Sequence, residues 1–168
     1  MRRPPVLAAA LGTILAADLC LERFELPWLA SGLLDEPAHV ATAVLALANL
    51  PPAPAGWTAS YLAGSVAVDA DHLPLIPIRH TLRLEDPRPA AHTLLVPAGL
   101  GLAARLTRGS AREIVLGAAA GTCAHFLRDL ATGSGLAPIQ PVASWRIKVP
   151  RAAYFVAMSV LAMRVRLS

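Results

Sequence analysis

Apolar and polar residues alternate along the chain in long blocks, and the apolar blocks have helical length. Six apolar stretches are separated by short polar or proline-rich segments. They cover residues 5–21, 38–50, 55–68, 91–106, 113–130 and 152–165. No stretch shows a convincing strand pattern of alternating apolar and polar residues. The pattern therefore predicts an all-α fold with one helix per stretch, in a single domain over residues 1–168.

Prolines and glycines mark where these helices should end. The sequence Pro-Pro-Ala-Pro at 51–54 ends the second stretch and precedes the third. The sequence Asp-Glu-Pro at 35–37 is typical of a helix start, so we expect His39 to open the second helix. We expect His92 to open the fourth helix, and an irregular loop at 133–150.

Composition favours a membrane location. Hydrophobic residues make up 55% of the chain and charged residues 15%, with a mean hydropathy of +0.54, whereas soluble domains carry about 25% charged residues. Most apolar stretches are shorter than the roughly 20 residues that span a bilayer core. Gly117 and Gly121 have the four-residue spacing that brings membrane helices into contact. We predict a compact polytopic helical membrane bundle of about six helices, some of them short or re-entrant.

The charged residues and cysteines exclude other classes of protein. The formal net charge is +4, and 14 of the 15 basic residues are Arg, spread along the chain rather than clustered. We therefore expect no nucleic-acid partner. Cys20 and Cys123 lie too far apart for a disulfide framework or a cysteine-based zinc motif. The apolar run after Met1 has no convincing cleavage site, so we expect an uncleaved first helix.

If every stretch crosses the membrane, the loops alternate between two ends of the bundle. The terminal end then holds both chain termini and the loops at 51–54 and 106–112. The site end holds the loops at 22–37, 71–90 and 131–150. The short segments of the terminal end are rich in Arg, which favours a cytoplasmic position for that end. Membrane lipids are then the expected surroundings of the protein.

The acids and histidines are concentrated at the site end of this arrangement. Asp69 and His72 share a helix face at a spacing of three residues, as His125 and Asp129 do at a spacing of four. Asp18 points to the same end. Ionisable residues inside a membrane are costly and are usually functional. The site end is therefore the candidate functional site.

Mixed imidazole and carboxylate ligands suit Zn, Mn or Fe. We predict one or two such ions, the two about 4 Å apart if both are present. The predicted metal ligands are His39, Asp69, Asp71, His72, His92, His125 and Asp129. The predicted catalytic residues are Asp71, Arg88, His92 and Asp129. Arg88 and Arg128 are expected to stabilise a developing anion, and His80 is a weaker candidate for contact with an anionic substrate.

Three segments resemble the membrane-bound metal-dependent hydrolases, the inner-membrane hydrolases of the YdjM type. That family has a Pro-Asp-hydrophobic-Asp-His segment, similar to Val-Asp-Ala-Asp-His at 68–72. Its His-Arg-Gly-x-Thr-His-Ser segment is matched in part at 87–93, where Pro87 replaces the first His and Ala91 replaces Thr. Its His-Leu-x-x-Asp segment is similar to 125–129, followed by Thr-Gly-Ser-Gly at 132–135 and a proline. An early His of the family corresponds to His39.

The resemblance covers residues 39–141 and implies hydrolysis of an ester or phosphodiester by metal-activated water. We expect a lipid or lipid-like phosphoester substrate that reaches the site from the bilayer, and the resemblance implies a bacterial inner-membrane location. Two alternatives remain open. The first is a non-enzymatic membrane scaffold, or a protein that handles ions or protons through its His/Asp layer. The second is a soluble helical protein with a buried His/Asp network.

Overall fold

The computed structural model describes residues 4–75, 90–133, 135–139 and 145–167. The helices are α1 (Pro4–Arg23), α2 (Trp28–Leu47), α3 (Ala55–Ala67), the 3-10 helix η1 (Val68–Leu75), α4 (Leu95–Leu106), α5 (Gly109–Asp129) and α6 (Arg151–Leu167). Within the described residues the chain forms no named strand, only two isolated β-bridges. The prediction of an all-helical chain with six α-helices is confirmed.

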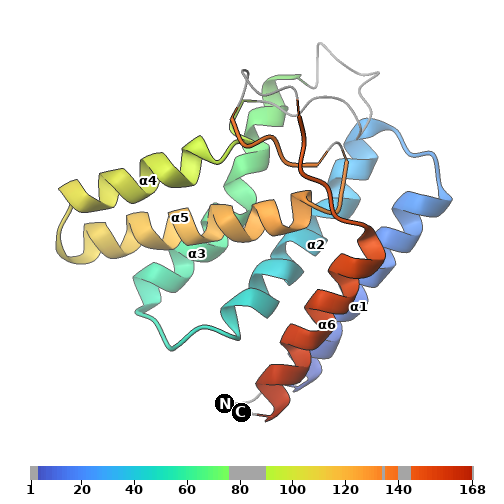
Figure 1. Cartoon of the computed structure of the whole chain (residues 1–168), viewed down its shortest axis with the longest axis horizontal. Coiled ribbons are helices and arrows are strands. Elements are labelled where there is room, and N and C mark those ends of the chain that lie inside the picture. Colours follow the sequence, from blue (N-terminus) through green and yellow to red (C-terminus); the bar gives the residue numbers. More distant parts are fainter. Residues whose placement is uncertain (1–3, 76–89, 134, 140–144, 168) are drawn as a thin grey trace.

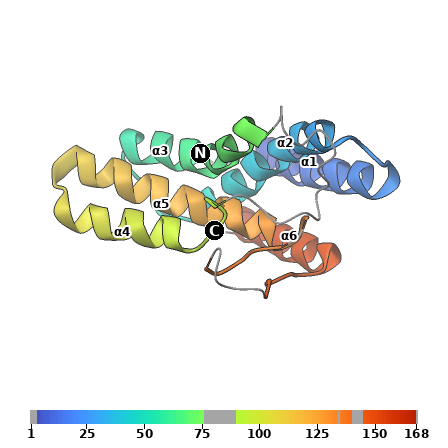
Figure 2. The same cartoon turned by 90° about the horizontal axis from the view of Figure 1, so that it is seen from above.

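Helix α5 occupies the centre of one half of the molecule, between α3 and α4 (Figures 1 and 2). Three glycines let α3 and α5 approach closely, namely Gly64, Gly117 and Gly121. A Cβ atom at Gly121 would collide with the backbone of Tyr61 and Ser65. The small-residue spacing noted in the sequence therefore serves the contact between α5 and α3.

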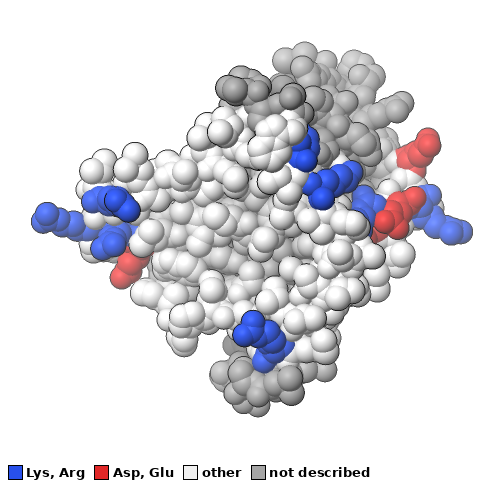
Figure 3. Space-filling model, in the orientation of Figure 1, with Lys and Arg blue, Asp and Glu red and all other residues white. Residues whose placement is uncertain are grey.

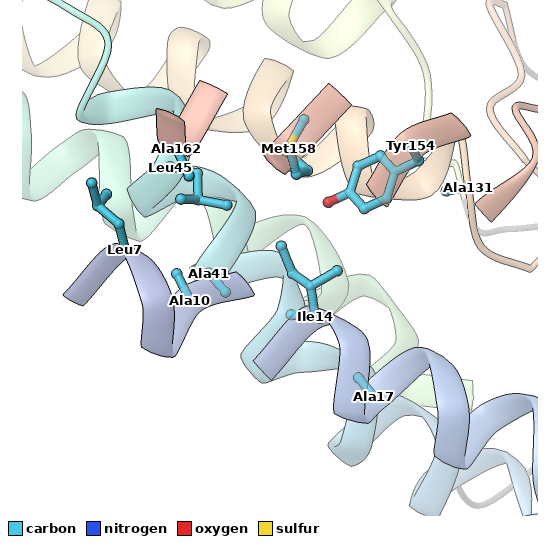
Figure 4. Close-up of a cluster of buried hydrophobic side chains, with 11 residues drawn as sticks. Leu7, Ala10, Ile14, Ala17, Ala41, Leu45, Ala131, Tyr154, Met158 and Ala162 are labelled. Carbon is cyan, nitrogen blue, oxygen red and sulfur yellow. The ribbon is translucent and has the colours of Figure 1, made fainter. Parts of the chain in front are cut away.

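Helices α1, α2 and α6 form the other half, around a core made largely of small apolar side chains (Figure 4). Ile14 of α1 and Leu45 of α2 are fully buried there, and Met158 of α6 packs against them. The Tyr154 hydroxyl is hydrogen-bonded to Thr42 of α2 within this core. Because alanine side chains are small, the axes of these helices lie close together. Asp35 and His39 of α2 then lie next to residues of α5.

The segments at the site end are held together by backbone hydrogen bonds. Leu136 and Ile147 exchange two backbone hydrogen bonds of 3.0 and 2.9 Å. The Pro138 carbonyl accepts from the Leu94 N–H at 3.1 Å and from the Thr93 hydroxyl at 3.0 Å. The turn that precedes α4, which carries His92, is therefore fixed by a segment more than 40 residues further along the chain.

The predicted start of the second helix was wrong, since α2 begins at Trp28 and passes through Pro37. A proline inside a helix costs roughly 3 kcal/mol because it removes a backbone hydrogen bond. The helix nevertheless continues through Pro37, and Asp35, just before it, lies against the buried Arg128. His39 therefore lies in the middle of α2 rather than at its start.

Two further boundaries differ from the sequence prediction. Helix α4 begins at Leu95, so His92 lies in the turn before the helix rather than in its first turn. Helix α5 begins at Gly109, four residues before the predicted start, with Gly109 at φ +56°. Glycine adopts this left-handed conformation without strain, so the polar turn is shorter than the sequence suggested.

Among the described residues, only α1 is both long and apolar enough to cross a membrane by length and composition. Helix α4 is apolar but much shorter, at 12 residues. Only 28% of the most apolar window of α1 is buried within the protein. Most of that window therefore lies at the surface of the described structure.

Candidate metal centre

Four separate elements bring acids and histidines together at the site end. Helix α2 supplies His39, and α5 supplies His125 and Asp129. The 3-10 helix η1 supplies Asp69, Asp71 and His72, and the turn before α4 supplies His92. His39, His92, His125 and Asp129 are at most 2% exposed. The predicted convergence of these residues is therefore present in the structure.

His125 is held in one orientation by the backbone of α3. Its Nδ1 lies 2.8 Å from the carbonyl oxygen of Ser65. Since a carbonyl only accepts, Nδ1 carries the proton, so Nε2 is the nitrogen that is left for a metal when the imidazole is neutral. That Nε2 is buried and has no hydrogen-bond partner among the described residues. A ring nitrogen fixed in this way is typical of a metal-ligating histidine.

An inner group consists of His39, His125 and Asp129, all buried. The two imidazoles are stacked, with centroids 3.9 Å apart and an interplanar angle of 16°. Asp129 Oδ1 lies 3.8 Å from His39 Nε2, and Asp129 Oδ2 lies 3.4 Å from His125 Nε2. These separations exceed the roughly 2.7–3.2 Å of N–H···O hydrogen bonds. They match the separation of about 3.3 Å between two ligands that share a tetrahedral zinc ion.

An outer group consists of Asp69, His72 and His92 and is partly open to solvent. Asp69 Oδ1 lies 3.0 Å from His92 Nε2 and 3.5 Å from His72 Nδ1. The side chains of Asp69 and His72 are 27% and 19% exposed, whereas that of His92 is fully buried. Solvent can therefore reach the outer group but not the inner one.

The two groups adjoin one another. His125 Nε2 of the inner group lies 3.7 Å from Asp69 Oδ1 of the outer group. His92 Nε2 of the outer group lies 3.9 Å from Asp129 Oδ2 of the inner group. Asp69 and Asp129 therefore each face histidines of both groups, which is the arrangement expected of carboxylates between two neighbouring cations.

Asp71 stands behind the histidines rather than between them. Its Oδ2 accepts a hydrogen bond of 2.9 Å from the Ala91 N–H, and its Oδ1 lies 3.1 Å from His72 Nδ1 and 3.6 Å from His92 Nδ1. His92 directs its other nitrogen towards Asp69, so Asp71 lies beside the opposite edge of the His92 ring. Burial opposes ionisation of Asp71, but the neighbouring His72 and His92 outweigh it and lower the pKa of its carboxyl.

The Asp69 carboxyl is also held in its charged form. Burial opposes ionisation, but the hydrogen bond to His92 and the neighbouring His125 and His39 lower its pKa. Glu36 of α2 also interacts with Asp69 and contributes to this lowering. Two carboxyl groups that lie this close are stable when they share a proton.

Arg128 does not have the anion-stabilising role predicted for it. The residue is fully buried, and its guanidinium donates to Asp35 Oδ1 at 2.9 and 2.5 Å and lies 2.9 Å from Asp18 Oδ1. It also lies over the Tyr154 ring, 5.6 Å from the centroid. A cation engaged by two buried carboxylates is not available to a substrate, so Arg128 joins α1, α2, α5 and α6 instead.

The sequence prediction missed two acids of α2, Asp35 and Glu36. Asp35 Oδ2 lies 3.6 Å from His39 Nε2, while its Oδ1 is bound by Arg128. Asp35 and His39 have the four-residue spacing of one helix face, a signal that was present in the sequence. It was obscured because Pro37 was interpreted as the helix start.

Two predicted residues, Arg88 and His80, lie outside the residues that the structure describes. Comparison with known proteins adds no further assignment, because no family model, curated protein or solved structure matches this chain. The resemblance to the membrane-bound hydrolases therefore rests on the three sequence segments alone.

Proposed function

We propose that the chain is a membrane-embedded hydrolase whose inner and outer groups hold two divalent cations. One observation carries the proposal: buried imidazole and carboxylate atoms of the inner group face one another at 3.4 and 3.8 Å. One ligand atom each of His39, His125 and Asp129 lies within 4.8 Å of the other two. Buried imidazole and carboxylate atoms that converge in this way are the donor set of a metal site.

The donor set identifies the class of metal. Imidazole nitrogens and carboxylate oxygens, with no thiolate, suit Zn, Mn or Fe. Cys20 and Cys123 are free and belong to neither group. In the proposed site His39, His125 and Asp129 hold the inner cation, and Asp69, His72 and His92 hold the outer one. When bound, such cations supply Lewis acidity and a water whose pKa lies near neutrality.

The residues of the outer group differ from the inner ones in access to substrate. Asp69 and His72 are partly exposed, whereas the inner group is closed. We therefore assign hydrolysis to the outer group and support of that group to the inner one. Asp71 orients His92, and Arg88 is retained as the proposed residue that stabilises a developing anion. The substrate class we propose is a lipid-like ester or phosphodiester.

The membrane location is supported by the molecular surface. White residues cover the middle of the face shown in Figure 3, whereas charged side chains lie towards its ends. Large apolar side chains are exposed on several helices, for example Leu19 at 56%, Leu102 at 63% and Val156 at 61%. Helices α1, α2 and α5 are each about 30 Å long at 1.5 Å per residue, which matches a bilayer core. We propose a bacterial inner-membrane location on the resemblance.

The ion-handling alternative has less support. A transport path needs polar groups that continue across the protein, as ionisable residues within membranes mark ion pathways. Among the described residues, every buried Asp, His and Arg side chain belongs to the site end: Asp18, Asp35, His39, His92, His125, Arg128 and Asp129. Beyond these, the buried polar side chains are hydroxyls such as those of Thr42 and Tyr61.

Metal-dependent turnover tests the proposal. The full chain, purified in detergent, is stripped with a chelator, reloaded with Zn, Mn or Fe, and assayed on an aryl phosphodiester and an aryl ester. We expect hydrolysis only after reloading, and loss of that activity in Asp129→Asn. The matched control is Glu113→Gln, since Glu113 is exposed at the terminal end. Equal hydrolysis by the stripped protein, or by Asp129→Asn, would refute the assignment.

A further inference from the structure

The turn between α4 and α5 combines three arginines with exposed leucines. Arg105 lies in the last turn of α4, Arg108 precedes α5, and Arg112 lies in the first turn of α5. All three are exposed. Leu106, between the first two, is 84% exposed. Basic side chains gather at the left of Figure 3, where α4 and α5 meet in Figure 1.

The charges within this turn are not balanced by the protein. Among the described residues, no carboxylate lies within ion-pair distance of Arg105, Arg108 or Arg112. The first turn of α5 contains no acidic residue, and Arg108 makes no capping hydrogen bond through its side chain. Cations beside a helix N-terminus face its positive dipole, which is unfavourable. An external anion relieves both the charge repulsion and the unsatisfied N–H groups.

Arg128, Arg151 and Lys148 at the site end, in contrast, each have a partner within the protein. Arg128 is buried between two aspartates, Arg151 lies 3.0 Å from Glu22, and Lys148 donates to the Gly133 carbonyl at 2.7 Å. Every described acid except Glu113 belongs to the site end: Asp18, Glu22, Glu25, Asp35, Glu36, Asp69, Asp71 and Asp129. The unbalanced positive charge is therefore at the terminal end.

We infer that the α4–α5 turn binds the anionic phospholipid headgroups of the cytoplasmic leaflet, so that the metal centre opens to the opposite side of the membrane. The inference rests on the membrane location proposed above. Arg residues in short loops next to membrane helices are retained on the cytoplasmic side, where anionic lipids attract them. Leu106 enters the acyl region between headgroups that the arginines bind. The outer group then takes substrate from the non-cytoplasmic leaflet.

Cysteine accessibility tests this orientation in the membranes of a bacterial host. In a Cys20→Ser, Cys123→Ser background, the full chain receives one reporter cysteine. Ser110→Cys reports the terminal end, and Glu25→Cys reports the site end, since both positions are exposed. Spheroplasts are treated with a membrane-impermeant maleimide before and after permeabilisation. We expect Glu25→Cys to react in intact spheroplasts and Ser110→Cys to react only after permeabilisation.

A triple variant tests whether the arginines set the orientation. Arg105→Gln, Arg108→Gln and Arg112→Gln together should make at least a tenth of the Ser110→Cys molecules react in intact spheroplasts. The matched control changes the same three residues to Lys, which keeps the charge and should keep the original orientation. An unchanged orientation in the Gln variant overturns the role of these arginines.

The reporters in the otherwise unchanged chain decide the orientation even if the Gln variant fails to accumulate. Reversed labelling, with Ser110→Cys reactive and Glu25→Cys protected, overturns the inference but leaves the proposed hydrolase intact. Recovery of the chain without detergent in the soluble fraction overturns both the inference and the proposed membrane location. Loss of metal-dependent hydrolysis in correctly oriented protein refutes only the proposed function.

Discussion

Replacement of the buried Arg128 should destabilise the fold more than any change to a surface arginine. In Arg128→Met, Asp35 and Asp18 would remain buried without their cation. Asp35 would lose two hydrogen bonds of 2.9 and 2.5 Å, and Asp18 would lose a contact of 2.9 Å. Removal of one partner from a buried ion pair costs about 3–5 kcal/mol. For a protein of this size that corresponds to a fall in Tm of roughly 6–20 °C.

Thermal unfolding followed by circular dichroism in detergent measures this effect. The control is Arg105→Met, the same substitution at an exposed position of α4, which should change stability by less than about 0.5 kcal/mol. The double variant Arg128→Met, Asp35→Asn should lose less stability than the sum of its two single variants, because it removes a charge that the first change leaves unpaired. If Arg128→Met unfolds at the same temperature as Arg105→Met, the buried ion-pair network does not hold the helices together.

Three further predictions concern packing, positioning and pH. Gly121→Ala should cost about 1–3 kcal/mol of unfolding free energy, because the added Cβ collides with the α3 backbone; denaturant unfolding measures it. Asp71→Asn should weaken metal affinity by roughly 10–100-fold, because Asp71 orients His92; competition with a chelating dye measures it. Bound metal should be released as the pH falls, because protonation of the imidazoles competes with the metal; dialysis at stepwise lower pH followed by metal analysis measures it.

Each of these predictions has a control and an outcome that contradicts it. Gly99→Ala, where a Cβ meets nothing within 4 Å, should not destabilise, and equal losses at both glycines would exclude close packing of α3 against α5. Unchanged affinity in Asp71→Asn would show that His92 needs no orienting carboxylate. The lowered pKa values of Asp69 and Asp71 keep these groups ionised as pH falls, so their stabilising contribution is complete above about pH 4 and lost only below it. Metal retained down to about pH 4 would therefore argue against histidine ligands.

Much of the site could be predicted from the sequence because its spacing is local. Asp69 with His72, and His125 with Asp129, lie on one face at spacings of three and four residues. Topology alone then placed these pairs at the same end of the bundle. The structure brings them to within ion-sharing distance, as the separation of 3.7 Å between Asp69 Oδ1 and His125 Nε2 illustrates.

The remainder depended on contacts between distant parts of the chain. Pro37 indicates a helix start by local rules, yet α2 runs through it, and Asp35 of the continued helix pairs with Arg128, 93 residues away. The position of His92 is set by hydrogen bonds of its neighbours Thr93 and Leu94 to the Pro138 carbonyl. Neither interaction can be predicted from the helix or turn preferences of the neighbouring residues. The same contacts explain why Arg128, a plausible substrate-binding residue by sequence, is a structural residue.

X-ray absorption at the zinc edge of the reloaded full-length protein tests the central claim most directly. The proposed centre predicts nitrogen and oxygen neighbours at about 2.0–2.2 Å, imidazole scattering and no sulfur. It further predicts that His125→Ala loses at least one of the bound zinc ions, since His125 Nε2 faces both groups. A sulfur neighbour at about 2.3 Å would assign the metal to a cysteine instead. A chain that retains no zinc after reloading, or an unchanged spectrum in His125→Ala, would contradict the account.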